Sequence, residues 1–147
     1  AEWEAAARCG EDTLYSGSSE VDEVAWHSGN SGDITHAVAS KASNECGLFD
    51  MGGNVWEWGQ DWIDEGYYSS SPSIDPLGPG ARTSRVVRGG SAWVGPEDCR
   101  VESRSGSVPW GRTHTIGFRL ARTAPDGPED HMEFDTGGPD DDEGEDL

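Results

Sequence analysis

The sequence predicts a single loop-rich domain in which one short helix is combined with several brief strands. Its 147 residues are an ordinary length for one domain. Hydrophobic residues make up only 33% of the chain, whereas its 21 glycines and 7 tryptophans are far above ordinary usage. A composition of this kind indicates long connections held by a few large aromatic side chains, and long helices are not expected.

The N-terminal part of the chain is predicted to hold one helix and two short strands. Residues 1–8 place apolar side chains three to four positions apart, which predicts a short amphipathic helix that ends at Cys9-Gly10. Residues 11–44 are rich in Gly, Ser, Asp and Asn and lack helical periodicity, so we expect loops there. Brief strands are predicted in the apolar pieces at 24–26 and 34–38.

A tight turn is predicted in the middle of the chain. The stretch 47–58 sets the pair Gly52-Gly53 between two apolar runs, and such a pair favours a backbone with positive φ. We therefore expect a functional loop at this position. Residues 69–82, which are rich in Ser, Pro and Gly, predict an exposed connection after it.

Three strands are predicted after this connection. Residues 84–93 predict a strand that enters a bend at Gly89-Gly90. The alternation in 100–104 predicts a second strand, and the alternation in 116–122 predicts a third, with Ile116, Phe118 and Leu120 on one face. This last strand is expected to close the domain.

The chain is strongly acidic, and its charge is unevenly distributed. The formal net charge is -19, and residues 124–147 hold eleven acidic side chains and no Lys or Arg. This segment is predicted to be a disordered acidic tail, which leaves a domain at residues 1–123. Such a field repels nucleic acid and anionic membranes, so neither is an expected partner. The charge also fits a salt-adapted host, although an acidic tail alone would explain it.

The cysteines and the apolar runs limit the possible classes of protein. Three cysteines, Cys9, Cys46 and Cys99, allow at most one intramolecular disulfide, exclude a paired-cysteine zinc site and leave the redox compartment open. No run reaches the roughly 18 apolar residues of a membrane span, which predicts a soluble chain of unknown localisation. The chain begins without Met and inside a helical pattern, so we expect a fragment of a longer protein.

Four segments of the chain carry a family resemblance. They are Ala1-Glu2-Trp3-Glu4 with Ala6-Ala7-Arg8, Cys46 to Trp58, Arg85 to Ser91, and Ile116-Gly117-Phe118-Arg119. In this order and spacing they resemble the C-terminal part of the sulfatase-modifying-factor family, to which the formylglycine-generating enzymes belong. The resemblance covers residues 1–123. It implies an α+β fold with little regular secondary structure, a variant of the C-type lectin architecture.

The resemblance also implies a calcium site in the stretch 47–58. Carried over position by position, the ligands would be the carboxylates of Asp50 and Glu57 and the carbonyl oxygens of Gly53 and Val55. Calcium prefers oxygen ligands from carboxylates and bent backbone. The alternative is a glycine turn packed by the neighbouring tryptophans, with Glu57 in solvent.

The resemblance bears on catalysis through two positions after the Gly-Gly-Ser bend. Family members that make formylglycine resemble one another in a pair of cysteines at these positions, which together hold copper and activate oxygen. A thiolate pair suits Cu(I). Here Cys99 matches the second position, whereas Val94 stands at the first and has no donor atom. Copper is therefore not expected, and a lone Cys99 is more typical of a small buried side chain than of a catalytic residue.

Three functional hypotheses follow from these residues. The first is a calcium-stabilised module that binds a peptide, protein or glycan, because aromatic and Arg side chains concentrate binding energy. Its candidate binding residues are Ser91, Trp93, Arg104, Trp110 and Arg112. In a variant of this hypothesis, residues 92–115 form the variable surface of a retroelement-diversified lectin-like display protein. The second is an oxidase that generates formylglycine in sulfatases. The third is a structural C-terminal half joined to a kinase or another signalling domain.

Overall fold

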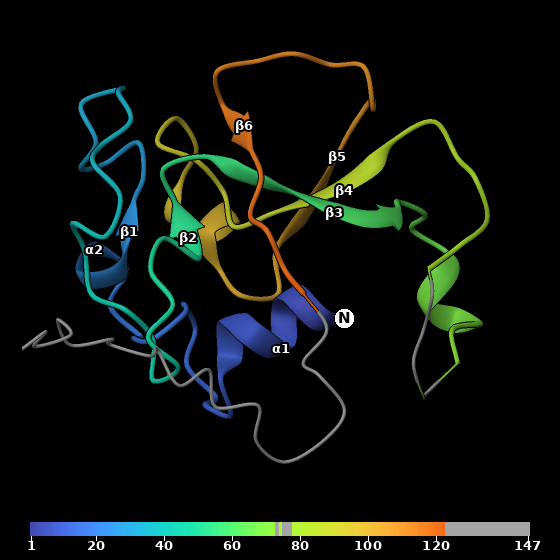
Figure 1. The fold of residues 1–147 in the computed structure, drawn as a ribbon, viewed down its shortest axis with the longest axis horizontal. Helices are drawn as coiled ribbons and strands as arrows, with labels where there is room; N and C mark the ends of the chain where they lie inside the picture. Colours follow the sequence, from blue (N-terminus) through green and yellow to red (C-terminus); the bar gives the residue numbers. More distant parts are fainter. Residues whose placement is uncertain (73, 75–77, 123–147) are drawn as a thin grey trace, which may run out of the picture.

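The computed structural model describes residues 1–72, 74 and 78–122, and in it short elements are joined by long connections (Figure 1). The helices are α1 (Glu2–Arg8) and α2 (Val21–Val24), with the 3₁₀ helices η1 (Tyr67–Ser69) and η2 (Pro96–Cys99). The strands are β1 (Ala25–Trp26), β2 (Gly52–Gly53), β3 (Trp56–Trp62), β4 (Arg85–Arg88), β5 (Arg104–Ser107) and β6 (Ile116–Gly117). Mixed sheets with few helices are consistent with the expected α+β class. The tail predicted at 124–147 lies outside the described residues.

Two sheets organise the fold. The larger sheet has the strand order β5-β4-β3-β6, in which β3 is antiparallel to β4 and parallel to β6. The smaller sheet is a parallel pair in which β1 lies beside β2. Because β3 lies between β4 and β6, Glu57 has Arg88 on one side and Gly117 on the other. The sheet therefore brings segments that are distant in sequence to one carboxylate.

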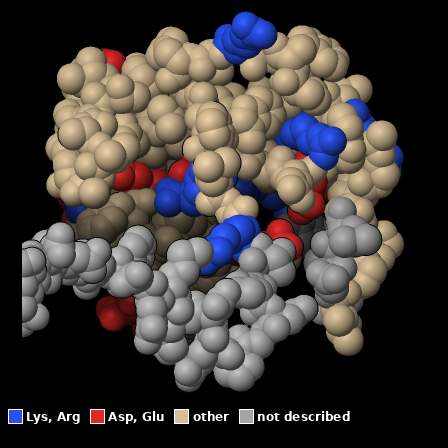
Figure 2. Space-filling view, in the orientation of Figure 1, with Lys and Arg blue, Asp and Glu red and all other residues tan. Residues whose placement is uncertain are grey.

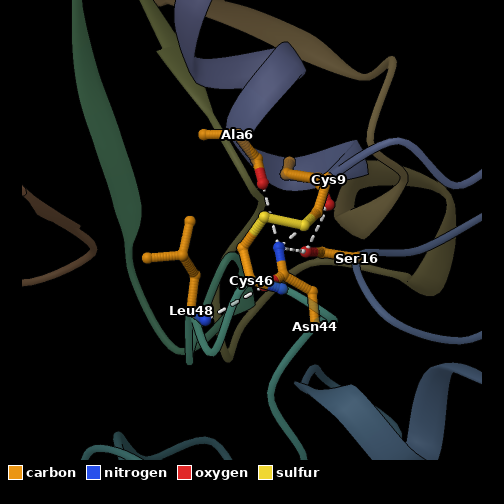
Figure 3. Close-up of a disulfide and its surroundings, with 7 residues drawn as sticks. Ala6, Cys9, Ser16, Asn44, Cys46 and Leu48 are labelled. Atoms are coloured by element: carbon orange, nitrogen blue, oxygen red, sulfur yellow. Dashed lines mark hydrogen bonds between the residues drawn. A yellow bond between two sulfur atoms is a disulfide. The ribbon is translucent and has the colours of Figure 1, made fainter. Parts of the chain in front are cut away.

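A disulfide and a buried asparagine fix α1 to the middle of the chain. Helix α1 ends as predicted at Cys9, which has a left-handed conformation with φ 49°. Cys9 is joined to Cys46 by the disulfide, and Asn44 lies beside it (Figure 3). The Asn44 amide donates to the carbonyl oxygen of Ala6 at 2.9 Å, and its Oδ1 accepts the N–H groups of Cys46 and Leu48 at 3.1 and 3.0 Å. The start of the stretch 47–58 is thereby held against the helix.

Among the described residues, most of the buried hydrophobic side chains form two small clusters. One contains Tyr15, Val24, Ala25 and Cys99, and the other contains Ala7, Met51 and Val101. Trp3 packs against the second cluster and is only partly buried. With so little apolar surface enclosed, the fold depends also on the disulfide and on buried polar contacts.

Two predictions for the segments around the bends have opposite outcomes. Strand β4 enters a bend at Gly89 and Gly90, whose φ angles are 88° and 75°, so this prediction is confirmed. The prediction of a strand at 34–38 is wrong, because the side chain of Asn54 forms hydrogen bonds with both the N–H and the carbonyl oxygen of His36. Asn54 Oδ1 accepts the His36 N–H at 3.0 Å, and Asn54 Nδ2 donates to the His36 carbonyl oxygen at 3.1 Å.

The strands near the C-terminal end of the described chain are shorter or displaced. The strand predicted at 100–104 begins only at Arg104, because Ser103 donates its N–H to the Arg100 carbonyl oxygen at 3.0 Å and closes a turn. The strand predicted at 116–122 stops at Gly117, and Phe118 and Leu120 are 74% and 88% exposed rather than on a buried face. Helix α2 and strand β3 were not predicted. No helix in the described part of the chain has the length and apolar character needed to cross a membrane.

Candidate functional site

The segment from Asp50 to Glu57 bends at three residues with positive φ. The φ angles are 55° at Asp50, 72° at Gly53 and 61° at Asn54. Glycine is required at position 53, because an added Cβ would lie 2.2 Å from the carbonyl oxygen of Trp26. The turn predicted from the glycine pair is therefore confirmed, and the segment is neither a continuous strand nor a helix.

The Glu57 carboxylate is buried and binds two side chains that are distant in sequence. The residue is 7% exposed, so the alternative of a solvated Glu57 is wrong. The indole N–H of Trp3 donates to Oε2 at 2.8 Å. Arg119 donates from Nε to Oε1 and Oε2 at 3.1 and 3.0 Å and from Nη2 to Oε1 at 2.7 Å. The same Nη2 group donates to the carbonyl oxygens of Phe49 and Asp50 at 2.9 and 3.2 Å, so Arg119 closes the loop as well as neutralising the carboxylate.

The remaining predicted calcium ligands lie on the same loop. Asp50 Oδ2 accepts the Ala39 N–H at 2.7 Å. The donor types, two carboxylates and two carbonyl oxygens on a bent backbone, fit a calcium ion. Within the described residues, no group of three or more His, Cys, Asp or Glu side chains could hold a metal ion. An ion at this loop would therefore depend on the carbonyl oxygens of Gly53 and Val55 and would share Glu57 with Arg119.

Cys99 ends η2 and is closed off from solvent. It is 1% exposed, and its Sγ lies 3.8 Å from the carbonyl oxygen of Gly95. Burial, together with the charge of Asp98, raises the pKa of the Cys99 thiol to about 12. The thiol is therefore protonated at neutral pH, whereas the thiolate is the form that attacks substrates and binds metals. Val94 precedes Gly95 and presents only carbon atoms.

Residues 92–115 bring two aromatic side chains together. Trp93 and His114 meet edge to face, with ring centroids 4.8 Å apart and an angle of 84° between the rings. Ser91 is buried, and its Oγ accepts the Trp93 N–H at 3.4 Å. Ser91 thus belongs to the framework that holds the Trp93 backbone, while the Trp93 ring lies near the start of residues 92–115.

The other predicted binding residues occupy two different places. Trp110 and Arg112 lie on the connection from β5 to β6, where Trp110 is 76% exposed and Arg112 is also exposed. Arg104 lies opposite Arg88 on β5 and lines a hollow beside α1, together with Trp3. Trp93, Trp110 and Arg112 do not line that hollow. The predicted binding residues therefore do not form one continuous set.

The chain resembles known proteins along most of its length. Residues 1–124 match the family described as "Sulfatase-modifying factor enzyme 1-like domain". The chain belongs to this family. It is 43% identical over 93 residues to a formylglycine-generating enzyme of Streptomyces coelicolor, which covers 61% of this chain and 30% of that enzyme. It is 40% identical over 126 residues to serine/threonine-protein kinase Pkn1 of Chlamydia trachomatis, which covers 83% of this chain and 20% of the kinase.

Solved structures share the fold of this sulfatase-modifying-factor domain. Treponema denticola variable protein 1 superposes with a TM-score of 0.74 at 39% sequence identity, over 80% of this chain and 43% of that one. PvdO from Pseudomonas aeruginosa superposes with a TM-score of 0.66 at 26% identity, over 80% of this chain and 48% of that one. The chain thus spans less than half of the length of each relative named here.

Some contacts of this sulfatase-modifying-factor domain were not predicted from the sequence. Arg119 lies in a segment that carried the family resemblance, yet its pairing with Glu57, 62 positions away, had no separate signal. Trp3 likewise lies in the first resembling segment, 54 positions from Glu57. Trp3, Arg119 and Glu57 each belong to a resembling segment. The order and spacing of those segments were therefore the only sequence features that could have indicated these contacts.

Proposed function

We propose that this chain is a ligand-binding module of the sulfatase-modifying-factor family, a variant of the C-type lectin fold, and not a copper oxidase. The observation that carries the proposal is the state of Cys99, which is 1% exposed and whose thiol pKa burial raises to about 12. Val94 supplies no second sulfur. One buried, protonated thiol is not equivalent to the two thiolates that Cu(I) favours.

The proposed binding face is built from residues 92–115. Trp93 with His114 forms one aromatic contact surface, and the exposed side chains of Trp110 and Arg112 form the other. Tryptophan and arginine supply most of the binding energy at protein interfaces, so a peptide, protein or glycan is the proposed ligand. In this proposal Ser91 acts by holding the Trp93 backbone. Arg104 lines the hollow beside α1 and is not part of this face.

Metal analysis and a peptide-oxidation assay test the proposal against the oxidase. The full chain is incubated with copper, oxygen and a sulfatase peptide that contains the target cysteine. We expect no tightly bound copper and no oxygen uptake above that of the Cys99→Ser variant. Oxygen uptake with stoichiometric copper in the wild type, lost in Cys99→Ser, would establish the oxidase and overturn the proposal.

We also propose that calcium stabilises the module. The ion would be held by the carboxylates of Asp50 and Glu57 and by the carbonyl oxygens of Gly53 and Val55, where it would cross-link a backbone that is bent at Asp50 and Gly53. The support is the fit of these oxygen donors to calcium. Arg119 already donates to both Glu57 oxygens, so the ion would add to an existing counter-charge.

Thermal unfolding in calcium and in a chelator tests this calcium proposal. At a calcium concentration roughly 100 times the Kd, preferential binding adds about 2.7 kcal/mol to the free energy of unfolding. We expect a higher Tm in calcium for the wild type and for Asp61→Ala, which removes a carboxylate outside the loop. Asp50→Ala should remove the difference. An identical Tm of the wild type in calcium and in chelator would refute the site and leave Arg119 as the counter-charge of Glu57.

A second candidate function is a diversified display protein. It is favoured by the likeness to Treponema denticola variable protein 1. Residues 92–115 lie between the buried bend Gly89-Gly90-Ser91 and β6. Ala92, Cys99 and Val101 within them are buried, whereas changes at exposed positions such as Trp110 and Arg112 would alter the surface and not the framework. Sequencing the gene from many isolates tests this candidate. Differences confined to 92–115 are expected, and differences spread evenly along the chain would contradict it.

A further inference from the structure

The arginines are concentrated in one stretch of a strongly acidic protein. Residues 1–75 hold fifteen acidic side chains and two basic ones, whereas residues 76–123 hold eight arginines and three acidic side chains. From Ser103 to Arg122 there are four arginines and no acidic residue. Exposed charges are screened over about 8 Å at physiological ionic strength. Arg88 and Arg119 already pair with Glu4 and Glu57, so a small ligand would be attracted by an exposed arginine outside these pairs and only weakly affected by distant charges.

The loop 108–114, which we call the aromatic loop, is exposed along nearly its whole length. The Gly111 N–H donates to the Val108 carbonyl oxygen at 2.8 Å and closes a turn that carries Trp110 outward. Arg112 follows and makes no hydrogen bond or ion pair with any residue that the structure describes. His114 ends the loop against Trp93. Aromatic and cationic groups are thus presented together.

Among the residues that the structure describes, few acidic side chains are visible on the surface near the aromatic loop. The connection from β5 to β6 crosses the top of Figure 1, and in the same orientation Figure 2 shows that the upper surface is nearly all uncharged. Most red carboxylates of this view lie in a band across its middle, and one lies at the upper left edge. The exposed indole of Trp110 and the exposed guanidinium of Arg112, two positions later in the loop, form a surface complementary to a ligand that is both apolar and anionic, with few visible carboxylates among the described residues.

We infer that the aromatic loop binds an acidic peptide segment that carries an aromatic or aliphatic side chain beside its carboxylates. The inference rests on the proposed binding function and names its ligand class. Trp110 receives the apolar side chain, and Arg112 binds a carboxylate through its planar fork of N–H groups. A nucleic acid also combines stacking groups with negative charge, but a long polyanion would extend from the loop into the field of the acidic remainder of the chain.

Fluorescence polarisation with the full chain tests the inference. The probes are labelled short peptides in which Asp or Glu alternates with Phe, Tyr or Leu, the same peptides with Asn and Gln in place of the acids, and oligothymidylate. We expect the acidic peptides to bind at least about tenfold more tightly than the other probes, with an affinity that falls as salt is raised.

Loop variants and a matched control locate the binding site. Trp110→Ala should weaken acidic-peptide binding by about tenfold or more, and Arg112→Gln should weaken it several-fold and flatten its salt dependence. Val38→Ala removes an apolar side chain of similar exposure, 80%, from another loop and should leave the affinity unchanged. Because Trp110 and Arg112 are exposed, neither variant should alter the fold, which circular dichroism would verify.

Each contrary outcome has a separate meaning. Equal binding of acidic and amide peptides, weakened by Trp110→Ala, would overturn the acidic ligand class and retain a binding module at this loop. Tighter binding of oligothymidylate would overturn the peptide in favour of nucleic acid. Acidic-peptide binding that survives both loop variants, or no binding to any probe, would also overturn the inference. If peptides bind only after the eleven acidic residues of 124–147 are replaced by Asn and Gln, the loop's ligand is the chain's own acidic segment and not a partner.

Discussion

Reduction of the Cys9–Cys46 disulfide is expected to destabilise the domain strongly. The bond closes a loop with a sequence separation of 37, and the chain-entropy model gives about 4 kcal/mol at 25 °C for a loop of this length. Natural domains are stable by only about 5–15 kcal/mol, so this single bond supplies a large share. For a domain of this size the corresponding fall in Tm is roughly 10–20 °C.

Urea unfolding followed by tryptophan fluorescence, with and without dithiothreitol, measures this contribution. The Cys9→Ser/Cys46→Ser double variant should match the reduced wild type and should not respond to dithiothreitol. Cys99→Ser should keep the full response, because Cys99 is not part of the disulfide. Equal free energies of unfolding for the oxidised and reduced wild type would refute the pairing, or would show that the reduced chain retains the contacts of Asn44 with α1 and Leu48.

Three further predictions follow from buried groups. Native Cys99 should resist thiol reagents. The free energy of unfolding should also fall above pH 9, by up to about 1.4 kcal/mol per pH unit, because the unfolded chain loses a thiol proton that the native state keeps until about pH 12. Urea unfolding measured at a series of pH values would show this. Gly53→Ala should lower the free energy of unfolding in urea by about 3 kcal/mol or more, because the added Cβ would clash with the backbone of β1. The control Gly47→Ala should lower it by only about 1 kcal/mol, because position 47 also has a positive φ of 73° but no atom lies within 4 Å of the added Cβ. Glu57→Gln should lower the free energy of unfolding by about 2 kcal/mol in the same assay, because Arg119 loses its counter-charge, although its guanidinium is partly solvated. An unchanged urea midpoint would contradict the pairing of Arg119 with Glu57.

Local signals in the sequence were sufficient for the bends and the first helix. Gly53, Gly89 and Gly90 have the positive φ that their pairing predicted, because glycine is the residue that adopts this conformation at low cost. Helix α1 follows from apolar spacing over two turns. The family was identified from motif residues that prove to lie together, since Trp3 and Arg119 both donate to Glu57.

Features set by distant contacts were missed or mistaken. Strand β3 reads Trp-Glu-Trp-Gly-Gln-Asp-Trp and lacks apolar residues at its centre, so only its partners β4 and β6 define it. The alternation at Phe118 and Leu120 predicted a strand with a buried face, but the backbone finds a strand partner only as far as Gly117. The positive φ of Asp50 and Asn54 was also not predicted, although Asp and Asn adopt this conformation more readily than other non-glycine residues. Whether these residues bind calcium stays a prediction.

The division between framework and surface explains how a sulfatase-modifying-factor domain could change its ligand without losing its fold. Gly90 is packed so that a Cβ would lie 2.9 Å from the Cys99 sulfur, and both residues lie on the buried side of residues 89–99. Substitution there therefore disturbs the core. Trp110 and Arg112 instead project from a turn closed by one backbone hydrogen bond, and exposed positions of this kind usually change stability by less than about 0.5 kcal/mol. In the proposed function, selection on binding would thus act on the aromatic loop almost independently of selection on folding.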